Sequence, residues 1–545
     1  MKLKKIIYSV SLKALVVAAV GTGCRKSQFN INRNTNNPTD STVTYDVVLP
    51  AALHASGTII ANQWGPLQNW MGFWARSGTY APNVVEETYE ITTGYGNGIW
   101  NACYDNNYDY QIIQSKANAA GAGLYEAVAR LMKAQNYQIL VDVYGNVPYT
   151  QALKGSGNPT PSYDKGIDIY KDLFRQADTA IALFKTSSSS ASANKDFATN
   201  DIIFGGNTTK WIHFANTLKL RWLVHCYAVA GIDKTVEINK INAEGSGYLV
   251  AGEDVQVQPG YKSDKPNPFY NNYKTNTAGS QTANNVYYRA NEWGIGYYAG
   301  DRDPRVEPSS VAPSGASRLY EAGANGLVGV AYGLPPITDN ASGNLAGIGP
   351  GLYKTNSSPQ NIMIAAESFF LQAEARQRGW ISTSTVQTLV QTGISESMRY
   401  LGLTDVPGAL AGYNSWNGGY PDVDATAGAV VTGGPAGGLF TILSQKWFAL
   451  NGVNTLEVWT DYRRVPYSEV ATKLSSGAAA PTDHFVYGDG AGYTPGPTIS
   501  VAPQNTSTKI PVRYLYPQTE YNYNAANVGA EGTIDRYTKI FWDLN

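Results

Sequence analysis

Histidine is scarce in this chain, and its spacing does not favour a metal or catalytic site. Of the 4 His, His213 and His225 share one predicted helix and lie 12 residues apart. That separation turns their side chains about 120° away from each other. No H-E-x-x-H, C-x-x-C, G-x-S-x-G or phosphate-loop motif occurs. We therefore predict partly buried, hydrogen-bonded histidines, with no metal, no cofactor and no catalytic residue.

Paired acids could hydrolyse a glycoside, which takes two carboxylates about 5 to 10 Å apart. The most conspicuous pair is Asp301 and Asp303, inside the run Gly300–Arg305. Because that run also holds two arginines, we expect both acids to be neutralised in a turn held by ion pairs. Glu86 and Glu87 are chain neighbours whose side chains point apart, which is typical of a solvated loop. An exported glycoside hydrolase stays an alternative that no acid pair favours.

Aromatic residues are the better candidates for ligand chemistry. The chain has 38 Tyr and 12 Trp, while only 15% of its residues are charged. Exposed rings stack on the flat C–H face of a sugar, and side-chain amides bind its hydroxyl edge. Aromatic residues crowd two segments, 64–95 and 287–298. From these segments we predict a stacking platform with polar neighbours, formed by Trp74, Tyr80, Trp293 and Tyr297 with Asn69, Asn83 and Asn291. A peptide ligand stays open, because the aromatic count alone does not exclude it.

The N-terminus has the pattern of an export signal. Residues 1–23 contain four Lys, no acid and a short apolar stretch, and they end in small residues before Cys24. The apolar stretch is shorter than the roughly 20 residues that span a bilayer. The pattern resembles a bacterial lipobox, which predicts a signal peptide over residues 1–23, lipidation of Cys24 and a polar tether over residues 24–42. Because 42 acidic residues outnumber the basic residues that remain, a nucleic-acid partner is not expected.

Apolar residues spaced three and four apart predict a mainly α protein. The clearest helices are Leu124–Tyr144 and Tyr163–Lys185, the second with Asp164 available as a cap. Further helices are predicted at Trp211–Val229, Asn361–Arg378, Val386–Leu401, Leu439–Asn451 and Thr455–Arg463. Strand signals are weak. The two other cysteines, Cys103 and Cys226, either form a disulfide or stay as buried thiols.

Long stretches rich in Gly, Ala, Ser and Pro separate these helices. They cover Pro308–Pro350, Pro407–Gly438 and Ser475–Pro503. Loops of this length inside a compact protein are usually functional surfaces or covers. We therefore expect one body over residues 43–545, in which a scaffold of helical hairpins carries a loop-rich lobe at roughly 245–360 and 403–436.

Several sequence blocks occur in an order that resembles the SusD/RagB family of outer-membrane nutrient-binding lipoproteins. The most characteristic block is DVYGNVPY at Asp142–Tyr149. The other blocks are Pro161–Tyr170, Asp201–Arg221, Asp301–Arg305, Glu367–Trp380, Gln445–Arg464 and Arg513–Asn527. The resemblance runs from the lipobox to the last residues of the chain.

This resemblance implies a scaffold of tetratricopeptide-like hairpins and a ligand-binding lobe that acts as a lid on a SusC-like TonB-dependent transporter. It implies a lipid anchor in the outer membrane, a cell-surface position, an oligosaccharide or peptide ligand and no catalysis. The matching blocks are mostly scaffold, so they assign no binding residues, and the platform proposed above depends on the aromatic residues alone. A structural adaptor without a small ligand is a further alternative.

Overall fold

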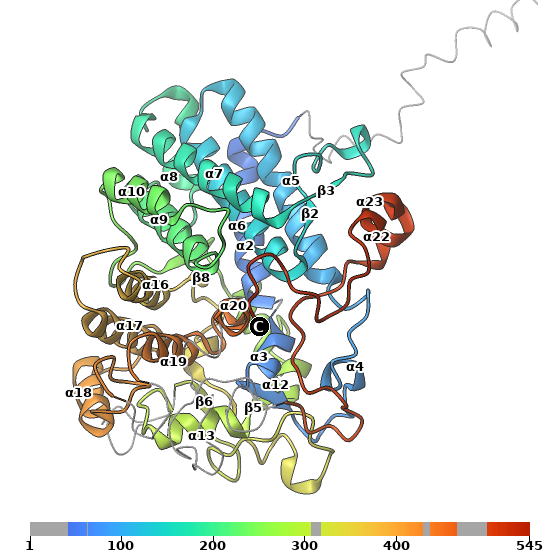
Figure 1. The fold of residues 1–545 in the computed structure, drawn as a ribbon, viewed down its shortest axis with the longest axis vertical. Coiled ribbons are helices and arrows are strands. Elements are labelled where there is room, and N and C mark those ends of the chain that lie inside the picture. Colours follow the sequence, from blue (N-terminus) through green and yellow to red (C-terminus); the bar gives the residue numbers. More distant parts are fainter. Residues whose placement is uncertain (1–41, 63, 307–317, 429–435, 466–498) are drawn as a thin grey trace, which may run out of the picture. The chain divides into compact units, whose positions relative to one another are not determined.

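The computed structural model describes residues 42–62, 64–306, 318–428, 436–465 and 499–545 (Figure 1). From Tyr45 to Asn545 the chain forms one compact unit. The predicted signal peptide, Cys24 and the tether up to residue 41 lie outside the described residues. Among the helices that are described, none combines the length and the apolar character that crossing a bilayer would require.

Consecutive helices pack against one another as hairpins in the first half of the scaffold. They are α2 (Tyr45–Asn62), α5 (Asn97–Ala120), α6 (Gly123–Tyr144), α7 (Gly166–Thr186) and α9 (Thr208–His225). Helix α6 lies between α5 and α7 and is buried along almost its whole length. The turn from α5 into α6 is short because Gly121 takes a left-handed conformation, with φ 69°, at the C-terminus of α5.

A second group of helices continues the scaffold. It comprises α10 (Lys234–Glu244), α16 (Ala365–Gln377), α17 (Val386–Leu401), α18 (Val406–Asn417), α19 (Leu439–Leu450) and α20 (Thr455–Arg464). Helix α16 contacts α17 and α19 within this group and α9 in the first group, so it joins the two halves of the scaffold (Figure 1). The expected mainly α fold with tetratricopeptide-like hairpins is confirmed.

Short elements joined by long loops build the rest of the unit. The helices are α3 (Gly65–Trp70), α4 (Val84–Glu87), α8 (Phe197–Asn200), α11 (Pro268–Tyr273), α12 (Ala283–Tyr287), α13 (Glu292–Gly300), α15 (Pro350–Tyr353), α22 (Gln518–Tyr523) and α23 (Ala525–Ala530). The described strands form four antiparallel pairs. These are β1 (Trp74–Arg76) with β5 (Tyr288–Ala290), β2 (Val147–Pro148) with β3 (Tyr163–Asp164), β4 (Val255–Val257) with β8 (Gln360–Met363) and β6 (Tyr320–Glu321) with β7 (Gly347–Ile348).

Three sequence expectations about helices are wrong. Residues 361–363, predicted as the start of the helix Asn361–Arg378, belong to strand β8, and α16 begins only at Ala365. The stretch Pro407–Gly438 was expected to be a loop, but α18 occupies its first part, capped by Asp405, which accepts a hydrogen bond from Gly408 N. Asp164 does not cap α7. Its carboxylate instead accepts hydrogen bonds from the backbone N–H groups of Tyr149 and Thr150, which fixes the β2–β3 turn.

Helix α5 is absent from the sequence expectations, although it is the longest helix described. Its buried face includes Asn106, a residue type that weakens the apolar pattern. The Asn106 side chain is satisfied inside the scaffold, because it donates to Ala52 O at 2.8 Å and accepts from Asn136 at 2.7 Å. Cys103 of the same helix and Cys226 are both buried free thiols, which settles the question of a disulfide between them.

Candidate functional site

The β1–β5 pair brings the two aromatic segments together. Trp74 pairs with Ala290 and Arg76 pairs with Tyr288. Just beyond the pair, Asn291 N donates to Phe73 O at 3.0 Å. Residues 64–95 and 287–298 are therefore neighbours in space, as a common platform requires.

Tyr80 and Asn83 lie at the surface of this region. The Tyr80 ring is 5.4 Å from the Tyr287 ring, and the Tyr80 hydroxyl donates to Ala283 O at 3.2 Å. Asn83 is exposed and caps α4, where its side chain accepts from Glu86 N. Tyr287 was not among the predicted platform residues, although it is partly exposed. Its position directly before Tyr288 in the second aromatic segment is the only sequence signal for it.

Trp293 and Tyr297 form a second aromatic pair on α13. Their ring centroids are 4.8 Å apart in an edge-to-face arrangement, and Trp293 also meets Trp447 of α19 at 5.4 Å. Trp293 is partly exposed, whereas Tyr297 is buried. Helix α13 thus presents one ring toward solvent and uses the other to hold it.

Trp74, Asn69 and Asn291 lie in the core. Trp74 is 1% exposed and packs between Tyr273 and Tyr288, each 5.3 Å away. Asn69 donates to Glu86 Oε1 at 2.6 Å, and Asn291 caps α13 by accepting from the Trp293 backbone at 2.9 Å. In this conformation the three side chains support the surface rings and present no face to solvent.

Glu86 and Glu87 are both buried, so the expectation of a solvated loop is wrong. Glu87 is neutralised by Arg76, whose Nε lies 2.5 Å from Glu87 Oε1. Glu86 has amide partners, Asn69 and Asn83. Burial raises the pKa of Glu86 to about 7, because these amides compensate only part of the cost of removing the carboxylate from water. From here on, the lobe means residues 64–95 and 283–302, which the β1–β5 pair joins. Its Glu86 carboxyl titrates near neutral pH.

The turn at Asp301–Arg305 matches its expectation only in part. Arg305 binds Asp303 with Nε 2.8 Å from Oδ1, and both side chains are fully buried. Arg302 does not neutralise Asp301, because its guanidinium lies over the ring of Trp416. Asp301 is buried beside the Tyr413 hydroxyl. Neither acid is placed to attack or protonate a substrate.

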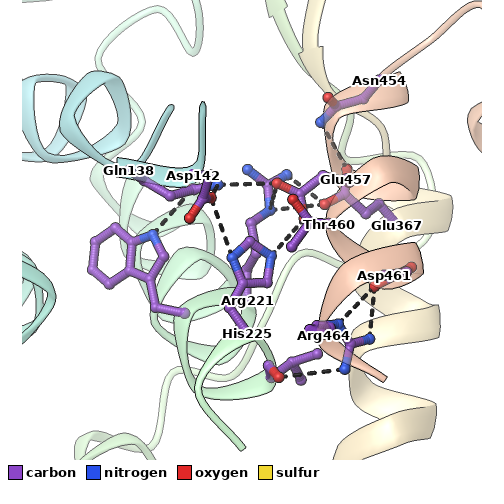
Figure 2. Close-up of polar contacts among 12 residues, drawn as sticks. Gln138, Asp142, Arg221, His225, Glu367, Asn454, Glu457, Thr460, Asp461 and Arg464 are labelled. Atoms are coloured by element: carbon purple, nitrogen blue, oxygen red, sulfur yellow. Dashed lines mark hydrogen bonds and ion pairs between the residues drawn. The ribbon is translucent and has the colours of Figure 1, made fainter. Parts of the chain in front are cut away.

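A buried network of charged side chains joins the scaffold helices (Figure 2). Arg221 of α9 binds Glu367 of α16 through Nε at 2.8 Å and also contacts Glu457 of α20 at 3.5 Å. His225, one turn further along α9, contacts Glu457 through Nε2 at 2.8 Å and Asp142 of α6 through Nδ1 at 3.3 Å. Four helices that are far apart in the sequence meet at these five side chains.

Asp142, His225 and Glu457 each offer a donor atom within 4.8 Å of the others, which is close enough for a metal to be considered. The geometry favours hydrogen bonds instead, because the two ring nitrogens of His225 face different carboxylates and one ion cannot use both. Asp142 also accepts from Trp542 Nε1 at 3.0 Å and from the Tyr170 hydroxyl. Burial lowers the pKa of His225, but the two carboxylates outweigh burial and the net shift is upward. We interpret the group as an imidazolium held between two carboxylates.

The network continues along α20 toward α16 and α19. Arg464 binds Glu374 at 2.7 Å and Asp461 at 2.7 Å, and Lys446 binds Asp461 at 3.0 Å. Burial raises the pKa of Glu374, but Arg464 outweighs burial and lowers it to about 2. The acids of this network are therefore structural groups that neutralise buried bases.

Comparison with known proteins gives one family. A model of the SusD-like family, described as starch-binding and associating with the outer membrane, matches residues 48–485. No curated protein matches the chain.

Several solved structures have the same fold. A chitin-binding SusD homologue from Flavobacterium johnsoniae is 21% identical, with a TM-score of 0.65 over 91% of this chain and 99% of that chain. A SusD-like protein from Bacteroides thetaiotaomicron is 20% identical, with a TM-score of 0.65 over 91% and 99% of the two chains. A SusD homologue from Bacteroides fragilis is 20% identical, with a TM-score of 0.66 over 92% and 99%.

The family model covers most of the chain. The sequence blocks that resemble the family also contain four residues of the buried network. Asp142 lies in the DVYGNVPY block, and Arg221, Glu367 and Glu457 lie in three further blocks. The chain therefore belongs to the SusD-like family of outer-membrane-associated, carbohydrate-binding proteins.

Proposed function

We propose that this protein is a cell-surface lipoprotein that captures an oligosaccharide and delivers it to a SusC-like TonB-dependent transporter. It breaks no bond in its ligand. The observation that carries this proposal is a set of partly exposed rings at the two ends of the β1–β5 pair. Tyr80 and Tyr287 lie at one end, and Trp293, packed on the buried Tyr297, lies at the other. Rings of this kind bind sugar faces without reactive groups.

The predicted site residues divide into two roles in this proposal. Tyr80 and Trp293 stack on the sugar, and Asn83 binds its hydroxyl edge. The buried residues of the predicted set hold these groups in place from the core side. They are Trp74, Tyr297, Asn69 and Asn291, and their burial and hydrogen bonds support this role.

A calorimetric screen of oligosaccharides and peptides tests the ligand class. We expect at least one oligosaccharide to bind, and we expect Tyr80→Ala and Trp293→Ala each to weaken that binding. Tyr523→Ala is the matched control, since Tyr523 is 77% exposed on α22, which lies away from β5 and α13 (Figure 1). If only peptides bind, the ligand of this protein is a peptide and not an oligosaccharide. Unchanged affinity in both platform variants would place the site elsewhere.

Incubation of the purified protein with polysaccharides separates binding from hydrolysis. We expect no new reducing ends, because Asp303 and Glu367 are buried in ion pairs with Arg305 and Arg221, and Asp301 is fully buried. Turnover of a substrate would contradict the proposal.

Two further measurements address the anchor and the partner. We expect mass spectrometry to find a lipid on Cys24 and a Cys24→Ser variant to leave the membrane fraction. We also expect the anchored protein to co-purify with a TonB-dependent barrel. Co-purification without any ligand in the screen would favour a structural adaptor.

A further inference from the structure

Arg302 occupies a position where an arginine is unusual. Helix α13 ends in a loop closed by two backbone hydrogen bonds, from Arg302 N to Ala299 O at 3.0 Å and from Asp303 N to Tyr298 O at 2.8 Å. In this type of helix end the residue in the left-handed conformation is most often glycine, because a Cβ disfavours it. Here that residue is Arg302, with φ 50°. Strained backbone of this kind clusters at functional sites.

The surroundings fix the direction of Arg302. On one side, Asn417 donates to Asp301 O at 2.8 Å, and on the other, Asp303 is locked to Arg305 inside the core. The Arg302 side chain therefore leaves a rigid turn. Its guanidinium carbon lies 3.2 Å from the ring centroid of Trp416 on α18.

The stacked pair is partly open to solvent, and no acid among the described residues forms an ion pair with it. Trp416 is 46% exposed although the guanidinium covers part of its ring. Within the described ranges, Arg302 forms no ion pair, and the acids nearest in sequence, Asp301 and Asp303, are fully buried. The guanidinium thus holds five N–H donors in one plane at a partly exposed position, without a side-chain acceptor in the part of the chain that the structure describes.

We propose that Arg302 and Trp416 form a subsite for the acidic group of the captured oligosaccharide, a uronate carboxylate or a sulfate. A planar guanidinium binds such a group through two parallel hydrogen bonds, and stacking on an indole preorganises it. The turn directly follows α13, which carries Trp293, so the subsite lies on the same lobe as the aromatic platform. This inference rests on the proposed function and specifies that the oligosaccharide carries a negative charge.

The glycine preference of this turn supplies the test. Arg302→Gly removes the guanidinium and relieves the backbone, so the variant should melt at the same temperature as the wild type or higher. The ligands are uronate-containing and sulfated oligosaccharides, each paired with a neutral counterpart that lacks the acidic group. We expect an acidic ligand to bind the wild type more tightly than its neutral counterpart. In Arg302→Gly its affinity should fall about tenfold, which corresponds to the loss of one charge-assisted contact.

Three comparisons sharpen this test. Affinity for the neutral ligand should not change in Arg302→Gly, and Arg302→Lys should recover only part of the acidic preference because an ammonium lacks the planar fork. Trp416→Ala should also weaken acidic binding. Arg175→Gln, which removes an exposed arginine on α7, is the control and should have no effect.

The outcomes separate this inference from the proposed function. The acidic subsite is overturned if the wild type binds acidic and neutral ligands with equal affinity. It is also overturned if Arg302→Gly weakens the binding of both ligands equally. Either result leaves oligosaccharide capture intact. Arg302-dependent binding of a peptide carboxylate, with no acidic oligosaccharide bound, overturns the ligand class. Absence of any oligosaccharide binding overturns the proposed function and the subsite with it.

Discussion

Glu457 and Glu374 in the scaffold and Glu86 in the lobe are buried carboxyl groups with opposite surroundings. In the scaffold, Glu457 and Glu374 each face buried bases, and those bases lower their pKa values. In the lobe, Glu86 is buried against amides and forms no ion pair among the described residues, and its pKa rises to about 7. Glu457 and Glu374 therefore stay ionised across the physiological range. The lobe can change its charge near neutral pH, next to the proposed sugar platform.

Breaking the scaffold network should lower the free energy of unfolding more than any other change proposed here. Arg221→Met leaves Glu367 and Glu457 without their shared base, so we expect the free energy of unfolding to fall by about 3 to 5 kcal/mol. Denaturant titration at constant pH measures this loss. Arg175→Gln, which breaks the exposed pair with Asp172, should cost less than about 1 kcal/mol. Equal losses in the two variants would show that the buried network does not hold the scaffold together.

Removing the buried lobe carboxyl should have a smaller and pH-dependent effect. The pKa of Glu86 is about 7 in the folded protein against an ordinary 4.5, so the folded state binds more protons between these values. The stability contributed by the protonated carboxyl is complete below pH 4.5 and is lost as pH rises through 7. The free energy of unfolding of Glu86→Gln, taken relative to that of the wild type, should therefore rise by on the order of 2 kcal/mol between pH 5 and pH 8.

Denaturant titrations of both proteins at the two pH values measure this gain. The control is Glu292→Gln, an exposed acid on α13. If the difference between wild type and Glu86→Gln is the same at both pH values, Glu86 carries a fixed charge and the contrast between lobe and scaffold fails.

Truncating the surface rings should have the smallest effect on stability. Tyr80→Ala and Trp293→Ala remove partly exposed side chains, so we expect each to cost about 1 kcal/mol or less in unfolding free energy while weakening oligosaccharide binding about tenfold. Calorimetry and thermal melting together separate the two quantities. A variant that loses both in proportion would indicate that the ring supports the fold and does not contact the ligand.

The sequence predicts most of the scaffold because its helices bury one regular apolar face. Helices α6 and α17 lie within a residue of their predicted bounds. Helix α5 escapes this reasoning because Asn106 lies on its buried face and is satisfied by partners from α2 and α6. The ion pairs of the network join residues up to hundreds of positions apart, and side-chain spacing carries no signal for such pairs.

The candidate site is only partly predictable for a related reason. Both aromatic segments are visible in the sequence, yet Trp74 is buried and Trp293, with the same side chain, is partly exposed. What separates them is the packing of Tyr273 and Tyr288 around Trp74, which depends on how β1 meets β5. Arg302 was expected to pair with an acid, and only the turn geometry shows that it faces Trp416.

Hydrogen exchange with and without a saturating oligosaccharide tests the central claim most directly, because it reports on lobe and scaffold in one measurement. We expect the ligand to slow exchange in peptides that cover residues 77–95 and 283–302, and to leave α6, α9 and α20 unchanged. Protection confined to those scaffold helices, with none in the lobe, would contradict the account.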